Sequence, residues 1–199
     1  MSMDFKNSIT KENLMKAFAG ESQARNRYTL AAGIAKKQNL YIVDFLFTFT
    51  ANQEKEHAEI FYKHLKDLAG ENIEITGAFP IDYSDNLEEL LLSAQHNEYE
   101  EAGHVYLDFG AKAKEEGFDK IAYSFLEIAK IEQTHGDRFG KVANMIKNNQ
   151  LFVSNVQSGF MCLNCGYIYE GTQAPKVCPV CQYDQGYFLS LELLSSAVR

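Results

Sequence analysis

The sequence predicts an all-α four-helix bundle followed by a small metal-binding domain with short strands. Residues 1 to about 148 of the 199-residue chain are rich in Ala, Leu, Glu and Lys and hold a single proline, which is typical of helices. Four segments of this part repeat apolar residues at helical spacing. The later residues hold all four cysteines, with Gly, Pro, Tyr and Val in short alternating runs that favour loops and strands.

The four helices are expected over residues 10–37, 41–69, 85–116 and 118–147. Short connections join the first helix to the second and the third to the fourth, so each pair should form an antiparallel hairpin. The third helix is expected to begin at Asp85, with Glu88 completing a capping box, and to end at Gly117. The connection between the second and third helices is about 15 residues long and contains Gly70 and Gly77, so it is long enough to cross the bundle.

Each helix places a carboxylate near the middle of its predicted core-facing stripe, which is read by stepping alternately four and three residues. The charged core positions are Glu21 on the first helix, Glu54 and His57 on the second, Glu98 and Glu101 on the third, and Glu132 and His135 on the fourth. Five carboxylates buried without counter-charge would cost several kcal/mol each or become protonated. Two metal cations would remove this cost, and carboxylate with imidazole suits iron, manganese or zinc. Arg25 is the one poor fit to the stripe of the first helix.

A Glu-x-x-His pair on its own is weak evidence, because Glu and His three residues apart usually form a surface pair. Here the arrangement repeats: Glu21 precedes Glu54 by 33 residues, and Glu98 precedes Glu132 by 34. Each half of the bundle thus supplies one Glu helix and one Glu-x-x-His helix, the ligand set of ferritin-like di-iron and di-manganese bundles. A third match ends at His104, beside the stripe, where a supporting or surface role is expected. His64 lies on the stripe a turn beyond the cluster and is expected to be structural.

Two tyrosines fall on the core side near the predicted metal ligands. Tyr28 follows Glu21 by seven residues, and Tyr106 follows Glu98 by eight. One interpretation is ordinary core packing, with each hydroxyl hydrogen-bonded locally. The other is that the hydroxyls donate to ligand carboxylates and to a bound oxygen species.

The cysteines form the pattern C-x2-C-x12-C-x2-C, as Cys162, Cys165, Cys178 and Cys181. Four thiolates at this spacing hold one tetrahedral zinc or iron. A disulfide-linked secreted protein would spread its cysteines over the fold, so the pattern indicates a metal site in a reducing compartment. The predicted domains are therefore a bundle over residues 1–148, a short linker over 149–158 that allows limited freedom, and the cysteine domain over 159–199.

The formal net charge is −8 and no basic stripe is present, which argues against a nucleic-acid partner. No apolar run approaches the roughly 20 residues that span a bilayer. The first residues are polar and lack an apolar signal segment. A cytoplasmic protein with no membrane partner is expected.

The motifs C-x-x-C-G-Y and C-P-x-C resemble rubredoxin, which indicates iron in the four-cysteine site, with zinc able to replace it. Gln182 stands where free-standing rubredoxins usually have Gly in a left-handed conformation, so mild strain is expected there. A ferritin-like bundle followed by such a domain resembles the rubrerythrin family over nearly the whole chain. The resemblance implies three irons per chain, two in the bundle and one on the cysteines.

The resemblance also implies roles for the bundle ligands. Glu54 and Glu132 would bridge the two irons, Glu21 would be terminal on one iron, and Glu98 with His135 would be terminal on the other. The first iron would exchange His57 for Glu101 on a change of oxidation state. Tyr28, Tyr106 and Glu101 are the candidate catalytic residues, as proton donors and as the exchanging ligand.

The function implied is a peroxidase that reduces hydrogen peroxide to water. Electrons would come from an external donor protein, a rubredoxin or an NAD(P)H-dependent reductase, through the four-cysteine iron. A head-to-tail homodimer is expected to bring this iron beside the partner's di-iron site. The alternatives are a ferroxidase that handles iron and a di-iron oxygenase, which would need a substrate pocket beside the metals.

Overall fold

The third predicted helix is divided by a π-helix, so the bundle contains five α-helices. The computed structural model describes residues 3–193 and confirms the predicted order, a helical bundle followed by a small three-stranded domain. The helices are α1 (Ile9–Lys37), α2 (Tyr41–His64), α3 (Leu87–Glu100), the π-helix Glu101–Val105, α4 (Tyr106–Glu115) and α5 (Asp119–Lys147). The strands are β1 (Val153–Cys162), β2 (Ile168–Gln173) and β3 (Phe188–Ser190). Short 3-10 helices span Phe5–Asn7, Lys66–Leu68 and Gln185–Tyr187.

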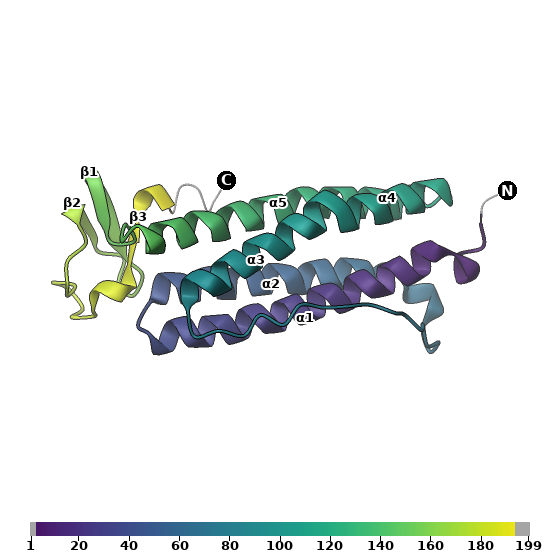
Figure 1. The fold of residues 1–199 in the computed structure, drawn as a ribbon, viewed down its shortest axis with the longest axis horizontal. Coiled ribbons are helices and arrows are strands. Elements are labelled where there is room, and N and C mark those ends of the chain that lie inside the picture. The colour runs from purple at the N-terminus through teal and green to yellow at the C-terminus, as the bar shows by residue number, and fades with distance from the viewer. Residues whose placement is uncertain (1–2, 194–199) are drawn as a thin grey trace.

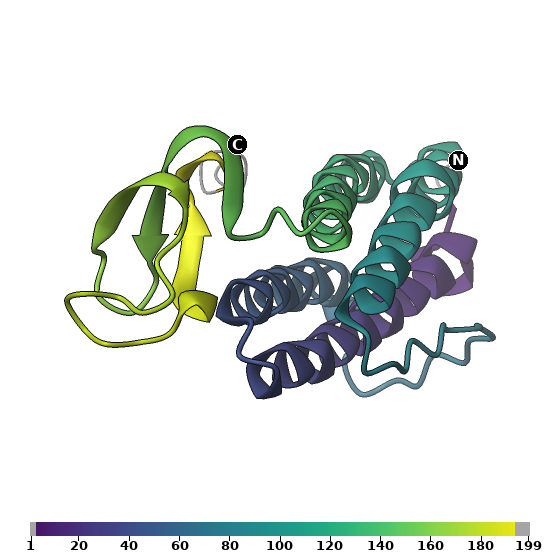
Figure 2. The ribbon, with the colours of Figure 1, turned by 60° about the vertical axis from the view of Figure 1, so that its left-hand side comes forward.

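The helices pack as two antiparallel pairs. Helices α1 and α2 form one hairpin, and α3 and α4 pair with α5 in the other (Figure 2). The segment 69–86 between them runs along the length of the bundle beside α1 (Figure 1). It therefore returns the chain to the end where α1 finishes, as its predicted length allowed, and α3 starts there.

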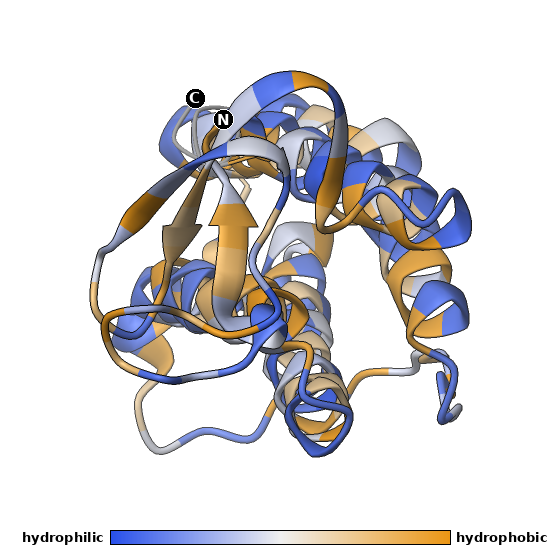
Figure 3. Cartoon of the chain, turned by 90° about the vertical axis from the view of Figure 1, so that its left-hand side faces the viewer, coloured by the Kyte–Doolittle hydropathy of each residue, from blue (hydrophilic) through white to orange (hydrophobic). Residues whose placement is uncertain are grey.

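Two hydrophobic clusters fill the bundle and leave a polar layer between them. One is centred on Phe47, Leu91 and Phe139, and the other on Phe61 and Phe125, all fully buried. Each such side chain stabilises the fold by about 1.5–3 kcal/mol relative to exposure. Hydrophobic and hydrophilic residues lie on different sides of the helices (Figure 3). These clusters hold the backbone that carries the charged residues.

The start of α3 differs from the prediction. Asn86, not Asp85, is the N-cap, and its side-chain oxygen accepts from the backbone N–H of Glu88 at 2.9 Å and of Glu89 at 3.4 Å. Either Asx residue can cap a helix, so composition did not separate them.

Two other bundle details differ as well. Helix α2 ends at His64, and a 3-10 turn, not a continued helix to residue 69, follows it. On α1 the buried position is Ala24, while Arg25 is exposed and leaves the predicted stripe.

The small domain is an antiparallel sheet of order β2-β1-β3. Strand β1 begins at Val153, inside the predicted linker, and Leu151 is buried against the bundle core. The rings of Tyr41, at the start of α2, and Tyr187 stack with centroids 3.8 Å apart. Gln182 has a positive φ of 64°, the left-handed conformation expected from the sequence. The domain thus packs on the end of the bundle where α2 begins (Figure 1).

Candidate metal centres

Six charged side chains from four helices meet in the polar layer of the bundle. They form two overlapping groups whose potential ligand atoms lie within 4.8 Å of one another. The groups are Glu21, Glu54, His57 and Glu132, and Glu54, Glu98, Glu132 and His135. Glu54 and Glu132 belong to both groups, which is the placement that bridging ligands require. The helices set this geometry, because Glu21, Glu54, His57, Glu132 and His135 lie well inside α1, α2 and α5. Glu98 lies near the end of α3, just before the π-helix.

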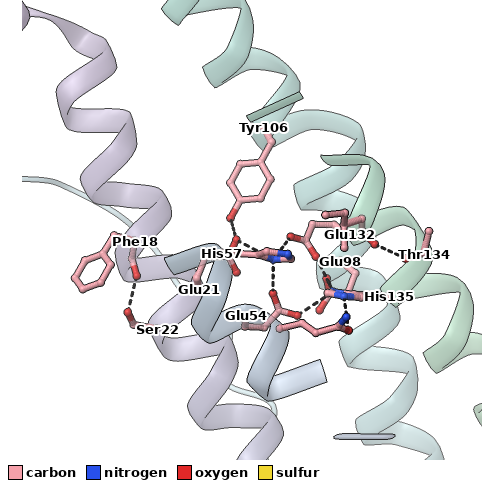
Figure 4. A network of polar contacts seen from close by, with 12 residues as sticks. Phe18, Glu21, Ser22, Glu54, His57, Glu98, Tyr106, Glu132, Thr134 and His135 are labelled. Carbon is pink, nitrogen blue, oxygen red and sulfur yellow. Dashed lines mark hydrogen bonds and ion pairs between the residues drawn. The ribbon is translucent and has the colours of Figure 1, made fainter. Parts of the chain in front are cut away.

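All six side chains are buried, and the most exposed of them, His57, is 5% exposed. Figure 4 shows them converging from α1, α2, α3 and α5. Within residues 3–193, no basic side chain other than the two histidines forms a recorded ion pair with these carboxylates.

Both imidazoles direct Nδ1 toward the shared carboxylates. His57 Nδ1 lies 3.0 Å from Glu54 Oε2 and 2.9 Å from Glu132 Oε1. His135 Nδ1 lies 2.7 Å from Glu132 Oε2 and 2.9 Å from Glu54 Oε1. The Nδ1 atoms are therefore the ones placed to bind metal.

Gln53 is a supporting residue that the sequence analysis missed. Its Oε1 lies 3.1 Å from His135 Nε2 and accepts from Arg138 Nη1 at 3.2 Å. A carboxamide oxygen can only accept, so His135 donates from Nε2, which leaves Nδ1 as the ring nitrogen available to a metal. Gln53 directly precedes Glu54 and lies off the core-facing stripe, so the helical periodicity did not indicate it.

The two tyrosines donate to carboxylates of the opposite helix pair. The Tyr28 hydroxyl donates to Glu98 Oε1, and the Tyr106 hydroxyl donates to Glu21 Oε1. Of the two interpretations of these residues, the structure shows the contact with candidate ligand carboxylates. In Glu98 the other oxygen, Oε2, lies 3.5 Å from His135 Nδ1, whereas in Glu21 the bonded Oε1 itself lies 3.9 Å from His57 Nδ1.

Burial and mutual repulsion raise the pKa of Glu21 and Glu98 well above the ordinary value. Burial opposes the charge on His57, but hydrogen bonds to Glu132 and Glu54 raise its pKa to about 9. Burial also opposes ionisation of Glu132, yet hydrogen bonds from His135 and His57 lower its pKa to about 2. Protons thus take the place of cations in the polypeptide alone.

Several buried atoms of the cluster have close neighbours within it but no hydrogen bond of satisfactory geometry. They are Glu21 Oε2, Glu54 Oε1, Glu98 Oε2, both carboxylate oxygens of Glu132, and His135 Nδ1. Such groups are normally satisfied, and two cations would satisfy all of them together. The residues present therefore fit a dinuclear carboxylate and histidine site of the di-iron kind.

Glu101 lies beside these groups and belongs to neither. It is the first residue of the π-helix and is half-buried. Burial and the charges of Glu132 and Glu54 raise its pKa, with a smaller opposing effect from Arg27. It is therefore electrostatically coupled to the cluster but lies outside both ligand groups.

The remaining histidines fall outside the cluster. His104 is exposed, in line with a surface role. His64 is half-buried, and its Nε2 lies 2.9 Å from Ser124 Oγ, a contact between α2 and α5 that supports a structural role.

The four cysteines form a second cluster in the small domain. Their sulfur atoms lie within 4.8 Å of one another, and both Cys162–Cys181 and Cys165–Cys178 are separated by 3.7 Å. None of them is in a disulfide. The two cysteine pairs lie on similar turns. Gly166 and Gln182 directly follow the second cysteine of each pair, and both have a positive φ. The arrangement fits one tetrahedral metal ion.

Comparison with known families gives two matches that together span most of the chain. The profile described as "Rubrerythrin" matches residues 12–143, and the profile described as "Rubrerythrin, rubredoxin-like domain" matches residues 160–189. The first covers the bundle cluster, and the second covers all four cysteines.

Similar proteins and solved structures extend these matches. The chain is 44% identical to a rubrerythrin of Clostridium perfringens, over 92% of this chain and 94% of that protein. It is 39% identical to a rubrerythrin of Nitratidesulfovibrio vulgaris, over 92% and 94% of the two chains. A mixed-valence state of nigerythrin aligns over 96% of this chain and 91% of that one, with a TM-score of 0.61 and 29% identity. A bacterioferritin of Desulfovibrio desulfuricans aligns over 71% of this chain and 81% of that one, with a TM-score of 0.62 and 25% identity.

Proposed function

This chain belongs to the rubrerythrin family, and from that premise we propose that it reduces hydrogen peroxide to water with electrons supplied through its cysteine domain. The observation that carries the proposal is the joining of two candidate metal centres in one chain. A buried carboxylate and histidine cluster suits oxygen chemistry, and a four-cysteine site suits single-electron transfer. Storage of iron would not need the second centre.

Iron in both centres accounts best for the donor sets. Glu21, Glu54, His57, Glu98, Glu132 and His135 would hold two irons, and Cys162, Cys165, Cys178 and Cys181 would hold one. When bound, the reduced pair supplies the two electrons that cleave an O–O bond.

The polypeptide contributes position, exclusion of water and protons. The buried carboxylates are held at fixed spacing by packed helices, and their walls are the apolar clusters on each side. Burial raises the pKa of Tyr28 and Tyr106, so both phenols keep their protons at neutral pH. Each proton is already directed at a ligand carboxylate, from which it can be passed to a leaving oxygen.

Glu101 is proposed as the ligand that replaces His57 on a change of oxidation state. It stands at the start of a π-helix, a local widening of the helix that is frequent at functional sites. The charge of Glu101 also raises the pKa of both Glu21 and Tyr28, so Glu101 acts electrostatically on the cluster.

We propose a head-to-tail homodimer for electron delivery. The cysteine domain contacts α2 at Tyr41, and His57 lies sixteen residues further along this helix, about 24 Å at 1.5 Å per residue. That distance is poor for direct transfer within one chain, and a partner's domain placed beside the cluster would shorten it. The external donor is expected to be a rubredoxin or an NAD(P)H-dependent reductase.

Rapid mixing tests the activity directly. The anaerobically reduced protein should be oxidised orders of magnitude faster by hydrogen peroxide than by dioxygen. Faster reaction with dioxygen, accompanied by uptake of ferrous ions, would favour the ferroxidase alternative that the likeness to bacterioferritin raises.

Subunit exchange tests the dimer. A Glu54→Ala, His57→Ala chain and a Cys178→Ser chain should each be inactive alone in donor-driven turnover. Heterodimers should regain activity, because the intact cysteine site of one chain lies beside the intact bundle site of the other. Proven heterodimers without activity would contradict electron transfer between chains.

A further inference from the structure

A cavity of about 280 Å³ lies between α1, the crossing segment 69–86 and the π-helix with the start of α4. Apolar residues make most of its wall, namely Ala17, Gly20, Phe79, Pro80, Val105 and Phe109. A water molecule occupies about 30 Å³ of liquid, and small-molecule pockets begin at about 300 Å³. The cavity is therefore much larger and more apolar than hydrogen peroxide requires.

The cavity reaches the bundle cluster. Glu101 and Tyr106 both line it, and the Tyr106 hydroxyl donates to Glu21 of the cluster. Figure 4 shows Tyr106 pointing from its helix toward Glu21 and His57. A molecule held in the cavity would thus lie next to the candidate reacting centre.

The outer wall is a tethered segment. Asp82 of the crossing segment forms an ion pair with Arg27 of α1 and accepts from Asn97 Nδ2 of α3 at 2.8 Å. Arg27 and Asn97 are half-buried residues. The side chains of the Arg27–Asp82 ion pair are only 12% and 16% exposed. This tether lies two residues after Pro80, so it restrains the part of the wall that Phe79 and Pro80 form.

We propose that the cavity binds the organic group of an alkyl hydroperoxide, which makes such compounds a second substrate class. The proposal rests on the peroxidase function proposed above. The balanced reaction is ROOH + 2 H⁺ + 2 e⁻ → ROH + H₂O. The O–O bond is reduced and broken, water leaves, and the electrons come from the donor protein through the two metal centres. The apolar walls stabilise the organic group R. The side-chain amides of Gln23 and Asn97 line the same cavity and can hydrogen-bond to the oxygens of the hydroperoxide.

Two glycines of α1 allow a matched test. A Cβ at Gly20 or at Gly33 would meet no atom within 4 Å, and neither has a positive φ, so a side chain can be introduced at both without a clash at Cβ. Gly20 lines the cavity, whereas Gly33 is exposed elsewhere on the same helix. Gly20→Leu should lower kcat/KM for cumene hydroperoxide by at least about tenfold relative to hydrogen peroxide, and Gly33→Leu should leave that ratio unchanged.

Binding supplies a readout that does not depend on turnover. The product alcohol 2-phenyl-2-propanol should give a saturation-transfer NMR signal with the metal-loaded wild type and with Gly33→Leu, and a lost signal with Gly20→Leu. Phe79 is 46% exposed, so Phe79→Ala should fold normally and weaken the signal by removing one wall.

The outcomes separate the two proposals. Slow reduction of hydrogen peroxide by the wild type would overturn the peroxidase function itself. Fast reduction of hydrogen peroxide with no reduction of cumene hydroperoxide would overturn only the wider substrate range. Equal losses for both peroxides in Gly20→Leu, with the alcohol still bound, would also overturn it.

Discussion

The two candidate metal centres are built in opposite ways. The bundle cluster draws its ligands from four long helices, and all six side chains are buried. The cysteine cluster sits on two loops, with Cys162 and Cys178 buried but Cys165 exposed. Hydrophobic clusters lie on both sides of the first, whereas the cysteines themselves form part of the small core around the second.

The difference determines how far each part of the molecule depends on bound metal for its folding. In the bundle, apolar packing stabilises the fold and opposes the cost of the buried charges. In the small domain the core is minor, so metal binding supplies folding free energy directly. Loss of metal should therefore unfold the cysteine domain and leave the bundle folded.

Cys178→Ser should produce the largest effect, because it removes a candidate ligand of the cysteine cluster and none of the bundle cluster. Donor-driven turnover should fall to background, while one round of oxidation of the pre-reduced bundle by peroxide should remain. Stopped-flow absorbance and steady-state assays measure the two reactions. Val180→Ser is the control, since Val180 lies between the two cysteines and is 64% exposed. Loss of the single-turnover reaction in a folded variant would contradict the division of labour.

Glu101→Ala should act on the other centre. Two-metal binding and the fold should persist, because Glu101 is outside both ligand groups. Peroxide turnover should fall by about tenfold or more, since a proton-transferring or exchanging group is lost. Glu115→Ala is the matched control, since Glu115 is an exposed carboxylate that belongs neither to the ligand groups nor to the cavity wall. Full activity of Glu101→Ala, with metal content verified, would rule out the exchanging role.

The metal-free bundle should lose stability as the pH rises. The pKa values of Glu21 and Glu98 are raised and that of His57 is raised to about 9, so each contributes stability at low pH that is lost on the way up. Glu132, with a pKa lowered to about 2, titrates below this window. The Tm of metal-free protein should fall by at least about 4 °C between about pH 5 and about pH 8.

Thermal denaturation followed by circular dichroism checks this pH dependence. The zinc-loaded protein is the control and should change much less, because metal replaces the protons. Parallel curves for the two forms would show that the cluster does not hold protons in the metal's place.

Gln53→Ala should have the smallest effect. It removes the acceptor for His135 Nε2 and frees the imidazole to change tautomer, which should weaken metal binding at the bundle site by about tenfold. Competition with a chelator measures the affinity, and Asn52→Ala, at an exposed neighbouring position, is the control. An unchanged affinity would show that packing alone orients His135.

Periodicity predicted the helices and the six buried charges because a core stripe repeats along each helix. It did not predict the π-helix, since nothing in Glu101–Val105 departs from helix composition. Tyr106, which directly follows the π-helix, is buried as expected, and Val105 beside it is half-buried. Gln53 was missed because its contact is with another helix, and such partners are set by tertiary packing.

The π-helix also explains a small mismatch between the two helix pairs. Glu21 precedes the first residue of α2, Tyr41, by 20 positions, and Glu98 precedes the first residue of α5, Asp119, by 21. Three residues separate the helices in both hairpins, and the middle one has positive φ, as Asn39 in one and Gly117 in the other. The difference of one residue therefore lies within the helix that contains the π-helix.

The two hairpins are thus near-equivalent halves of a pseudo-symmetric site, and a one-residue insertion breaks the equivalence. Tyr28 and Tyr106 make the same bond across it in opposite directions, each to the first Glu of the other half. Only the half with the insertion has a glutamate three positions after that Glu, because Ala24 stands in the corresponding place on α1. Asymmetry between the two metal positions, which an exchanging ligand requires, can therefore arise from a single added residue in an otherwise duplicated frame.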